Sequence, residues 1–232
     1  MDRKVMIGCP VRNRAWILQD YLHSLLKMDY PSRLIEYCFI INDCQDQTPE
    51  ILADFAATAP SPVYLVNINL NTRYGHKRGE YSFKNLALLR NLLLERFLQS
   101  MCQYLFSVDS DILVPPNTLR DLMADRCDIV SALVCNGHLV GQRNLFNVLE
   151  KTPQGNYVHI KKIPFNRLFE VDCTGAAYLI SRQVIEDYGV RYSAEYGAED
   201  IGFCQRAKQQ GIKIFCDSRV ECIHVMQEYK KD

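Results

Sequence analysis

The first half of the chain alternates short apolar runs with segments of helical periodicity. Apolar runs closed by Pro or by polar clusters predict four buried strands, at 4–9, 35–41, 63–68 and 104–108. Between them, apolar residues recur every three or four positions, which predicts helices over 15–28, from residue 48 onward and over 83–99. Such alternation favours right-handed crossovers. We therefore predict an α/β fold with a mainly parallel central sheet flanked by helices.

The second half of the chain is less regular. Its patterns predict a helix after Pro115-Pro116, strands over 128–134, 176–180 and 220–223, and a helix over 199–210. Residues 137–168 are polar and contain scattered Gly, Asn and Pro, so we expect an excursion from the core there. No internal repeat, low-complexity tract or interdomain linker interrupts the chain, and we predict one domain, 1–232.

Charge and hydropathy limit the classes of partner. The 27 basic and 27 acidic side chains balance, so no global field attracts nucleic acid, and we expect no nucleic-acid partner. No apolar run approaches the roughly 20 residues that cross a bilayer. The apolar stretch after residue 4 is too short for a signal-peptide core, and we expect a cytoplasmic location without a transmembrane segment.

The ten cysteines contain no CxxC pair, which argues against a zinc ribbon or a thioredoxin-like site. Most stand among apolar residues of predicted strands, where a free Cys packs as a small hydrophobe. We expect reduced, buried thiols. A catalytic Cys/His pair remains an alternative that no local motif favours.

Polar clusters follow three of the predicted strands: Arg12-Asn13-Arg14, Asn42-Asp43 and Asp109-Ser110-Asp111. Ligands of open α/β sheets bind beyond the carboxyl ends of the strands, so these clusters are expected to meet at one site. Asp109 and Asp111 are two residues apart, and their side chains point to the same side. Two such carboxylates can bind Mg²⁺ or Mn²⁺ together with substrate phosphates, although a DxD triplet alone is common in solvated loops.

Three further features are candidates for chemistry. Glu199-Asp200 opens a predicted helix, where the pair can complement the helix dipole or supply a general base. His224 follows a predicted strand, and its imidazole suits a Mn²⁺ site, although a lone His is more often a packed or surface residue. The loop 73–84 is basic, and Arg78 and Lys84 could neutralise a diphosphate or simply be solvated.

Taken in order, these segments resemble the GT-A glycosyltransferases, especially family 2, over about residues 4 to 225. The sequence CPVRN at 9–13 resembles that family's first nucleotide-binding loop, and NDCQDQT at 42–48 resembles its "DDGSxDxT" segment. Leu89-Arg90-Asn91 is similar to "aRN", and SVDSD at 107–111 is similar to "lDsD". DCTGA at 172–176, then GAED at 197–200 with Cys204-Gln205-Arg206 and Gly211, resemble the acceptor-side and "xED…clR…G" stretches.

The resemblance implies a GT-A fold in which 1–114 bind a nucleotide sugar and 115–232 bind the acceptor and carry catalysis. It implies metal binding by Asp109, Asp111 and His224, with Mn²⁺ or Mg²⁺. It assigns catalysis to Asp200 as base, with Glu199 orienting the acceptor. The stretches 137–168 and 191–196 are expected to shape the acceptor site. The remaining donor contacts are expected from Pro10, Arg12, Asn13, Asp43, Arg78, Lys84, Asp109 and Ser110.

The implied reaction transfers one sugar to a hydroxyl of a glycan, peptide or small molecule, with inversion. UDP-hexose is the first expectation for the donor and GDP-mannose the second. Cys44-Gln45 replaces the usual Gly-Ser, and the QxxRW motif of processive synthases is absent. Residues 111–128 also resemble the yeast mannan-polymerase mannosyltransferases, which retain configuration. A nucleotidyltransferase, which needs a Gly-rich loop after the first strand, and a non-catalytic nucleotide-sugar-binding protein remain as rivals.

Overall fold

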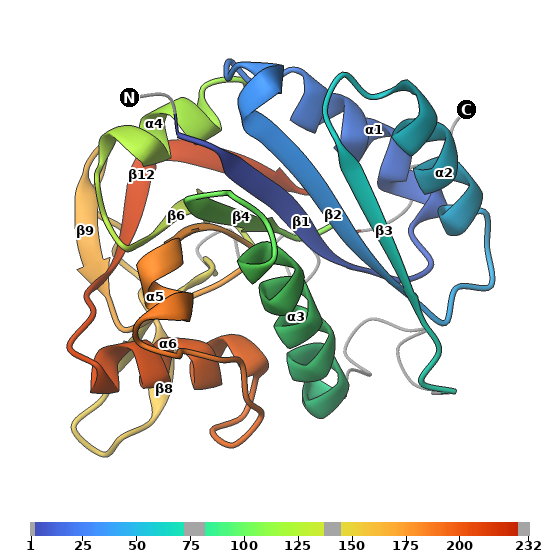
Figure 1. The fold of residues 1–232 in the computed structure, drawn as a ribbon. Helices are drawn as coiled ribbons and strands as arrows, with labels where there is room; N and C mark the ends of the chain where they lie inside the picture. Colours follow the sequence, from blue (N-terminus) through green and yellow to red (C-terminus); the bar gives the residue numbers. More distant parts are fainter. Residues whose placement is uncertain (1–2, 72–81, 137–144, 227–232) are drawn as a thin grey trace.

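The computed structural model of the chain describes residues 3–71, 82–136 and 145–226. The helices are α1 (Ala15–Leu26), α2 (Thr48–Thr58), α3 (Phe83–Leu98), α4 (Thr118–Ala124), α5 (Arg182–Glu186) and α6 (Glu199–Gln209), with a 3₁₀ turn at Ser32–Leu34 (Figure 1). The strands are β1 (Val5–Val11), β2 (Ile35–Asn42), β3 (Val63–Ile68), β4 (Tyr104–Val108), β5 (Ile112–Leu113), β6 (Ile129–Val134), β7 (Val148–Lys151), β8 (Tyr157–His159), β9 (Leu168–Val171), β10 (Cys173–Thr174), β11 (Ala177–Ser181) and β12 (Ile214–His224).

One large sheet of the described chain has the strand order β3-β2-β1-β4-β11-β6-β12-β5, with β9 paired to β12. Strands β1, β2, β3, β4, β6 and β12 share one direction, while β11, β5 and β9 run against it. The predicted α/β fold with a mainly parallel sheet is therefore confirmed. Strand β11 is reversed because the chain reaches it from the β10 corner, without a crossover helix.

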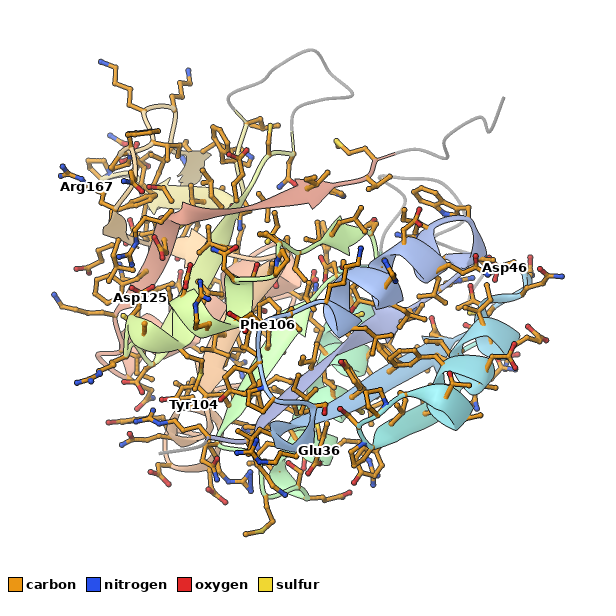
Figure 2. All side chains as sticks on the ribbon, turned by 90° about the horizontal axis from the view of Figure 1, so that it is seen from above. Glu36, Asp46, Tyr104, Phe106, Asp125 and Arg167 are labelled. Carbon is orange, nitrogen blue, oxygen red and sulfur yellow. The ribbon has the colours of Figure 1, made fainter. Side chains whose placement is uncertain are left out.

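Helices cover both faces of this sheet (Figure 1). One core cluster joins the sheet to α1, α2 and α4, and the other joins it to α3, α5 and α6. Strand β1 shows why both clusters form: Val5, Ile7 and Cys9 face the first, whereas Met6 faces the second. This period of two on a doubly covered sheet gives the continuous apolar run seen in the sequence. Phe106 lies at the centre of the molecule and Asp46 near its edge (Figure 2).

Most predicted elements appear within one or two residues of their expected bounds, and two segments differ more. The excursion 137–168 contains β7 and β8, which form a small three-stranded sheet with β10. Strand β12 is much longer than the predicted 220–223 because a bulge between Asp217 and Glu221 carries it across a polar stretch. Among the described residues, no helix combines the length and the apolar character needed to traverse a bilayer.

Helix α2 begins at Thr48, which is therefore its first residue and not its N-cap. The Thr48 backbone N–H instead donates to Oδ1 of Asp46 at 3.1 Å, and its hydroxyl oxygen accepts from the Arg14 backbone N–H at 2.7 Å. Asp46 Oδ2 also accepts from the Ala15 backbone N–H at 3.0 Å. Burial opposes ionisation of Asp46, but the hydrogen bonds from Thr48 and Ala15 outweigh it and lower the pKa of this carboxyl. Asp46 therefore joins the starts of α1 and α2.

Candidate active site

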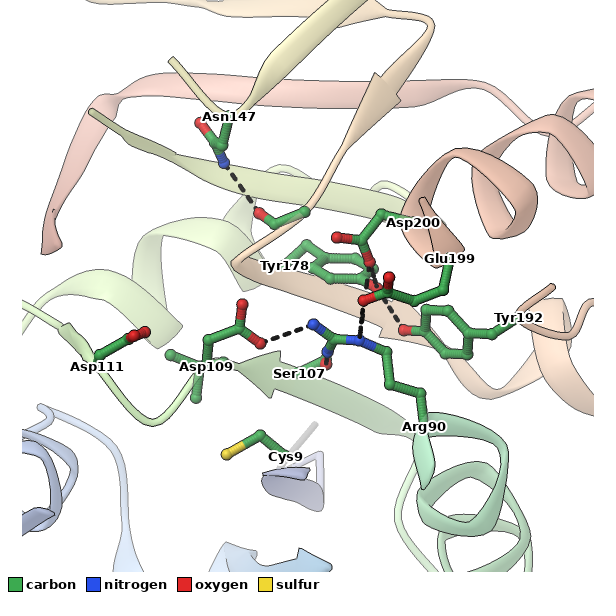
Figure 3. Close-up of polar contacts among 12 residues, drawn as sticks. Cys9, Arg90, Ser107, Asp109, Asp111, Asn147, Tyr178, Tyr192, Glu199 and Asp200 are labelled. Carbon is green, nitrogen blue, oxygen red and sulfur yellow. Dashed lines mark hydrogen bonds and ion pairs between the residues drawn. The ribbon is translucent and has the colours of Figure 1, made fainter. Parts of the chain in front are cut away.

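A buried guanidinium gathers the acidic residues of the site. Arg90 lies on the sheet-facing side of α3 and is 4% exposed. Its Nη2 donates to Oδ1 of Asp109 at 2.8 Å, its Nε to Oε1 of Glu199 at 3.1 Å, and its Nη1 to Oγ of Ser107 at 3.2 Å (Figure 3). Burial alone would lower the pKa of Arg90, but Asp109, Asp200 and Glu199 raise it well above its ordinary value. Arg90 is therefore a permanent cation that links β4 to the start of α6.

Asp200 lies beside this cation, with Oδ1 at 3.9 Å from Arg90 Nε. Burial raises the pKa of Asp200 to about 7, and the negative charges of Glu199 and Asp109 act in the same direction against Arg90. Its Oδ1 also accepts a hydrogen bond from the Tyr178 hydroxyl at 3.2 Å. A carboxyl that titrates near neutrality, held by one hydroxyl and one cation, has the properties of a general base.

Two buried tyrosines complete the wall behind Asp200. The hydroxyl groups of Tyr178 and Tyr192 are hydrogen-bonded to each other, and the Arg90 guanidinium lies 5.6 Å from the Tyr192 ring centroid. Asn91 fixes the Tyr192 backbone twice: its Nδ2 donates to the carbonyl at 3.0 Å, and its Oδ1 accepts from the N–H at 2.9 Å. Arg90 thus holds the acids, and its neighbour Asn91 holds Tyr192 in the segment 191–196.

Gly175 lies directly against the Asp200 side chain, where a larger residue would displace the carboxylate. A Cβ at Gly175 would lie 2.3 Å from Asp200 Oδ2 and 2.9 Å from its Cγ. Asn147 Nδ2 donates to the Gly175 carbonyl at 3.0 Å, which holds this corner of the chain against β6. The next residue, Ala176, has φ of 66° and accepts from the Asp109 backbone N–H at 2.8 Å. The β10–β11 corner therefore positions both Asp109 and Asp200.

The second acid of the triplet has different neighbours. Asp111 Oδ1 lies 3.6 Å from His224 Nε2, and its Oδ2 accepts from Arg14 Nη2 at 3.3 Å. Pairing of β5 with β12 sets His224 opposite Ile112 and so brings the imidazole to Asp111. His224 Nδ1 lies 2.7 Å from Asn136 Oδ1; because that oxygen can only accept, Nδ1 carries the proton and Nε2 faces Asp111. An oxygen that accepts from the ring nitrogen facing away from the metal is typical of metal-binding histidines.

The predicted metal ligands are therefore only partly brought together. Asp111 and His224 are adjacent, whereas Asp109 directs Oδ1 to Arg90. Within the described ranges, no group of three or more His, Cys, Asp or Glu residues could hold a metal unaided. One carboxylate and one imidazole, with remaining positions for phosphate and water, nevertheless fit Mn²⁺ or Mg²⁺, which commonly take part of their ligands from the substrate.

The loops after β1 and β2 also lie at this edge of the sheet. Asn13 has φ of 49°, and its Oδ1 accepts from the Gln45 backbone N–H at 2.8 Å. Asp43 has φ of 44°, and its Oδ1 accepts from the backbone N–H groups of Leu70 and Asn71 at 3.1 and 3.3 Å. Strained backbone in adjacent loops is common at ligand sites. Asn13 and Asp43 thus fix the geometry of the three loops that follow β1, β2 and β3.

The other predicted donor contacts have varied positions. Pro10 is part of β1, opposite Ile40, and Ser110 is buried in the turn between the two acids. Lys84 is exposed in the first turn of α3. Arg78 lies outside the described residues. Six residues that contribute to the site were not predicted from the sequence: Arg90, Ser107, Asn136, Asn147, Tyr178 and Tyr192.

All ten cysteines are free thiols, and eight of them are buried. Burial raises the pKa of Cys9, Cys38, Cys216 and Cys222 to about 12. These thiols stay protonated at neutral pH and cannot act as thiolate nucleophiles. The expected burial of these thiols is confirmed.

Solved structures share this arrangement of strands and helices. The mannosyltransferase PcManGT from Pyrobaculum calidifontis, in complex with GDP-Man and Mn²⁺, has a TM-score of 0.64 at 18% identity, covering 99% of this chain and 59% of that one. S. aureus TarS 1-349, in complex with UDP-GlcNAc, has a TM-score of 0.60 at 19% identity, covering 97% and 60%. The chain therefore has the GT-A glycosyltransferase fold that its motifs predicted.

The chain belongs to the Anp1 family, whose model matches residues 1–146. The Schizosaccharomyces pombe "Mannan polymerase II complex anp1 subunit" is 28% identical over 145 residues, 55% of this chain and 34% of that protein. The Mus musculus "Procollagen-lysine,2-oxoglutarate 5-dioxygenase 2" is 25% identical over 234 residues, 94% of this chain and 29% of that protein. The chain thus spans about a third of the length of these curated relatives.

Proposed function

We propose that this chain is a metal-dependent glycosyltransferase that moves a single sugar from a nucleotide diphosphate sugar to an acceptor hydroxyl. The observation that carries the proposal is the Arg90 bridge from Asp109, in the DxD turn, to Glu199, beside Asp200. A donor-binding acid and a candidate base are held on one buried cation. Sugar transfer needs these two groups at a fixed separation, since reacting groups must be held in near-attack geometry.

On the donor side, Asp111 and His224 are the proposed ligands of Mn²⁺ or Mg²⁺, with Asp109 acting directly or through water. The bound metal would offset charge on the leaving diphosphate. Asn136 orients His224, and the same donor half, 1–114, is proposed to hold the nucleoside with Asn13 and Asp43. Pro10, Arg12 and Ser110 are proposed as further donor contacts, and Lys84 and Arg78 are proposed to approach the phosphates.

On the acceptor side, Asp200 is the proposed base of an inverting displacement. It takes the proton from the acceptor hydroxyl as the oxygen attacks the anomeric carbon and the nucleoside diphosphate leaves. The pKa of about 7 supports this role, because the carboxylate and the acid are both populated near neutral pH. Glu199 is held by Arg90 and orients the acceptor within the half 115–232. A glycan, peptide or small-molecule hydroxyl is the proposed acceptor, bound near 137–168 and 191–196.

UDP-hexose is the donor proposed from the sequence, and GDP-mannose is the second candidate. The second is favoured by a specific observation: the Anp1 family match covers residues 1–146, which include the whole proposed donor half. The matching relative is named a mannan polymerase subunit. A mannosyl donor would raise the prospect of a retaining reaction, in which Asp200 is not the base.

A donor screen followed by product analysis tests the proposal. The melting temperature is measured with UDP-hexoses, GDP-mannose and nucleoside triphosphates, each with Mn²⁺ and with a chelator. A ligand that binds the native state raises the melting temperature. We expect a metal-dependent rise with one nucleotide sugar. NMR of the product's anomeric centre should show inversion; retention would refute Asp200 as base, and a response to triphosphates alone would favour a nucleotidyltransferase.

A further inference from the structure

A tight turn on the edge of the sheet carries an exposed aromatic side chain among cations. Phe165 is 91% exposed, and its neighbours Lys161, Lys162 and Arg167 are exposed as well. The turn immediately precedes β9, and Arg167 lies at the margin of the molecule (Figure 2). None of the contacts described for the acidic site involves this turn, which lies at the far end of the stretch 137–168 proposed to approach the acceptor.

The turn is held rigidly, so the exposure of Phe165 is not the result of fraying. Ser218 Oγ donates to the Pro164 carbonyl at 2.6 Å and accepts from the Arg167 backbone N–H at 3.0 Å. The Ser218 backbone N–H donates to the Arg167 carbonyl at 3.0 Å. Ile163 packs against the core cluster of α3, α5 and α6. The chain is thus anchored on both sides of Phe165, and the ring is directed outward.

The charge around the turn is positive although the whole chain is neutral. No Asp or Glu occurs between Glu150 and Glu170, a stretch that contains Lys151, Lys161, Lys162 and Arg167. Glu170 is paired with Lys213 at 3.2 Å. Near Ser218, Arg219 pairs with both Asp217 and Asp125. Together with Lys161, Lys162 and Arg167 this gives five cations against three acids, so the turn still presents a local excess of positive charge.

We propose that the turn 161–167 docks on an anionic membrane surface, with Phe165 entering the interfacial layer and Lys161, Lys162 and Arg167 facing lipid phosphates. One aromatic ring on a convex turn cannot bury the roughly 1,200 Å² of a stable protein interface. A bilayer needs no complementary shape. Insertion of an aromatic ring and attraction of cations to lipid phosphates both strengthen binding to a bilayer. Each cation raises the affinity about fivefold. Binding of this kind is reversible and weakens with salt.

Vesicle sedimentation of the full chain tests the proposal. The probe is phosphatidylcholine vesicles, alone or with an equal part of phosphatidylserine. We expect binding to the anionic vesicles only. Reversal of two charges in K161E/K162E should weaken it about 25-fold or more, and Phe165→Ser about tenfold. Met101→Ser, which removes an apolar side chain that is 76% exposed, is the matched control and should bind as the unmodified chain does.

A second measurement identifies the contact directly. Phe165→Trp in a Trp16→Phe background places the only indole at the turn, and anionic vesicles should shift its emission to shorter wavelength. Absence of binding to anionic vesicles, or equal binding by K161E/K162E, would overturn the proposal. So would lipid-independent self-association that Phe165→Ser abolishes, because the turn would then be an interface between copies of the chain. None of these outcomes depends on glycosyltransferase activity.

Discussion

Arg90 and Glu199 are 109 residues apart in the chain, yet Arg90 Nε donates to Glu199 Oε1 at 3.1 Å in an environment where both side chains are buried. The same guanidinium holds Asp109 at 2.8 Å. Since three carboxylates, those of Asp109, Glu199 and Asp200, surround one cation, the site is an electrostatic unit. Removal of the Arg90 cation should affect both the free energy of unfolding and the catalytic rate.

Arg90→Met should lower the free energy of unfolding by about 3–5 kcal/mol at neutral pH, because Glu199 is left as an unpaired buried charge. The loss should shrink at acidic pH, because protonation removes the buried negative charge that Arg90 no longer balances. Chemical denaturation at several pH values measures this. Arg182→Met is the control, because Arg182 donates to the backbone carbonyls of Leu98 and Phe97 and its acidic partner Glu186 is exposed, so its loss should depend little on pH.

Asp200→Asn should reduce turnover by on the order of 10²–10⁴, the usual contribution of a positioned base, with little change in donor affinity. Turnover of the unmodified chain should rise as pH increases through about 7, since only the ionised carboxylate accepts the proton. Steady-state rates across pH check both points. A variant that keeps turnover within a few-fold would show that Asp200 is not the base.

Asp200→Asn should change the free energy of unfolding in the opposite sense to turnover, and the size of this change should also depend on pH. The folded-state pKa of Asp200 is raised from 3.8 to about 7, so the folded chain binds the proton more tightly than the unfolded chain between these values. Asp200 therefore costs stability as pH rises through this window. Asp200→Asn should be the more stable protein at neutral pH and should match the unmodified chain below pH 3.8. Equal stability at neutral pH would contradict the raised pKa.

Gly175→Ala should displace the Asp200 carboxylate, because the new Cβ would lie 2.3 Å from its Oδ2. A shift of about 1 Å in a reacting group can cost on the order of 10²-fold in rate, so turnover should fall while donor binding remains. In an Asp200→Asn background, Gly175→Ala should add little further loss. A full additional loss there would mean that Gly175 acts through another group.

Asp111→Asn should remove the metal dependence of nucleotide binding and leave the fold intact, because it neutralises a proposed ligand with 18% side-chain exposure. Calorimetry of UDP and GDP with and without Mn²⁺ measures this. His224→Ala should weaken Mn²⁺ binding in the same assay, with partial recovery at excess metal. Asp20→Asn, on an exposed position of α1, is the control for a change of charge alone. Unchanged metal dependence in both site variants would refute the assignment.

The fold was predictable because the strands of the first half are predominantly apolar runs, as in Ile35–Asn42, and polar residues follow the strand ends. Arg90 was not predicted as a site residue, although a signal existed. Ala87, Arg90, Leu94 and Phe97 share the buried face of α3, with spacings of three or four residues. An Arg on that face predicts a buried acid as its partner. The partner itself, on α6, could not be read from local sequence.

His224 was predicted at the metal site, but the role of Asn136 was not. Strand β12 crosses a bulge at Asp217, whose polar neighbours broke the apolar pattern in the sequence. Because β12 continues past the bulge, it places His224 beside both Asp111 and Asn136. Likewise, the contact between Gly175 and Asp200 depends on the β10–β11 corner that Asn147 holds. Such long-range contacts depend on the register of the strands, which local periodicity does not determine.

Release of nucleoside diphosphate from a panel of UDP-hexoses and GDP-mannose tests the central claim most directly. The unmodified chain and Asp200→Asn are compared with Mn²⁺ and with a chelator. We predict slow release from at least one nucleotide sugar without acceptor, acceleration by its acceptor, complete dependence on metal, and loss of the accelerated phase in Asp200→Asn. Absence of release from every donor in the presence of Mn²⁺, with nucleotide binding intact, would contradict the account and identify the chain as a nucleotide-sugar-binding protein.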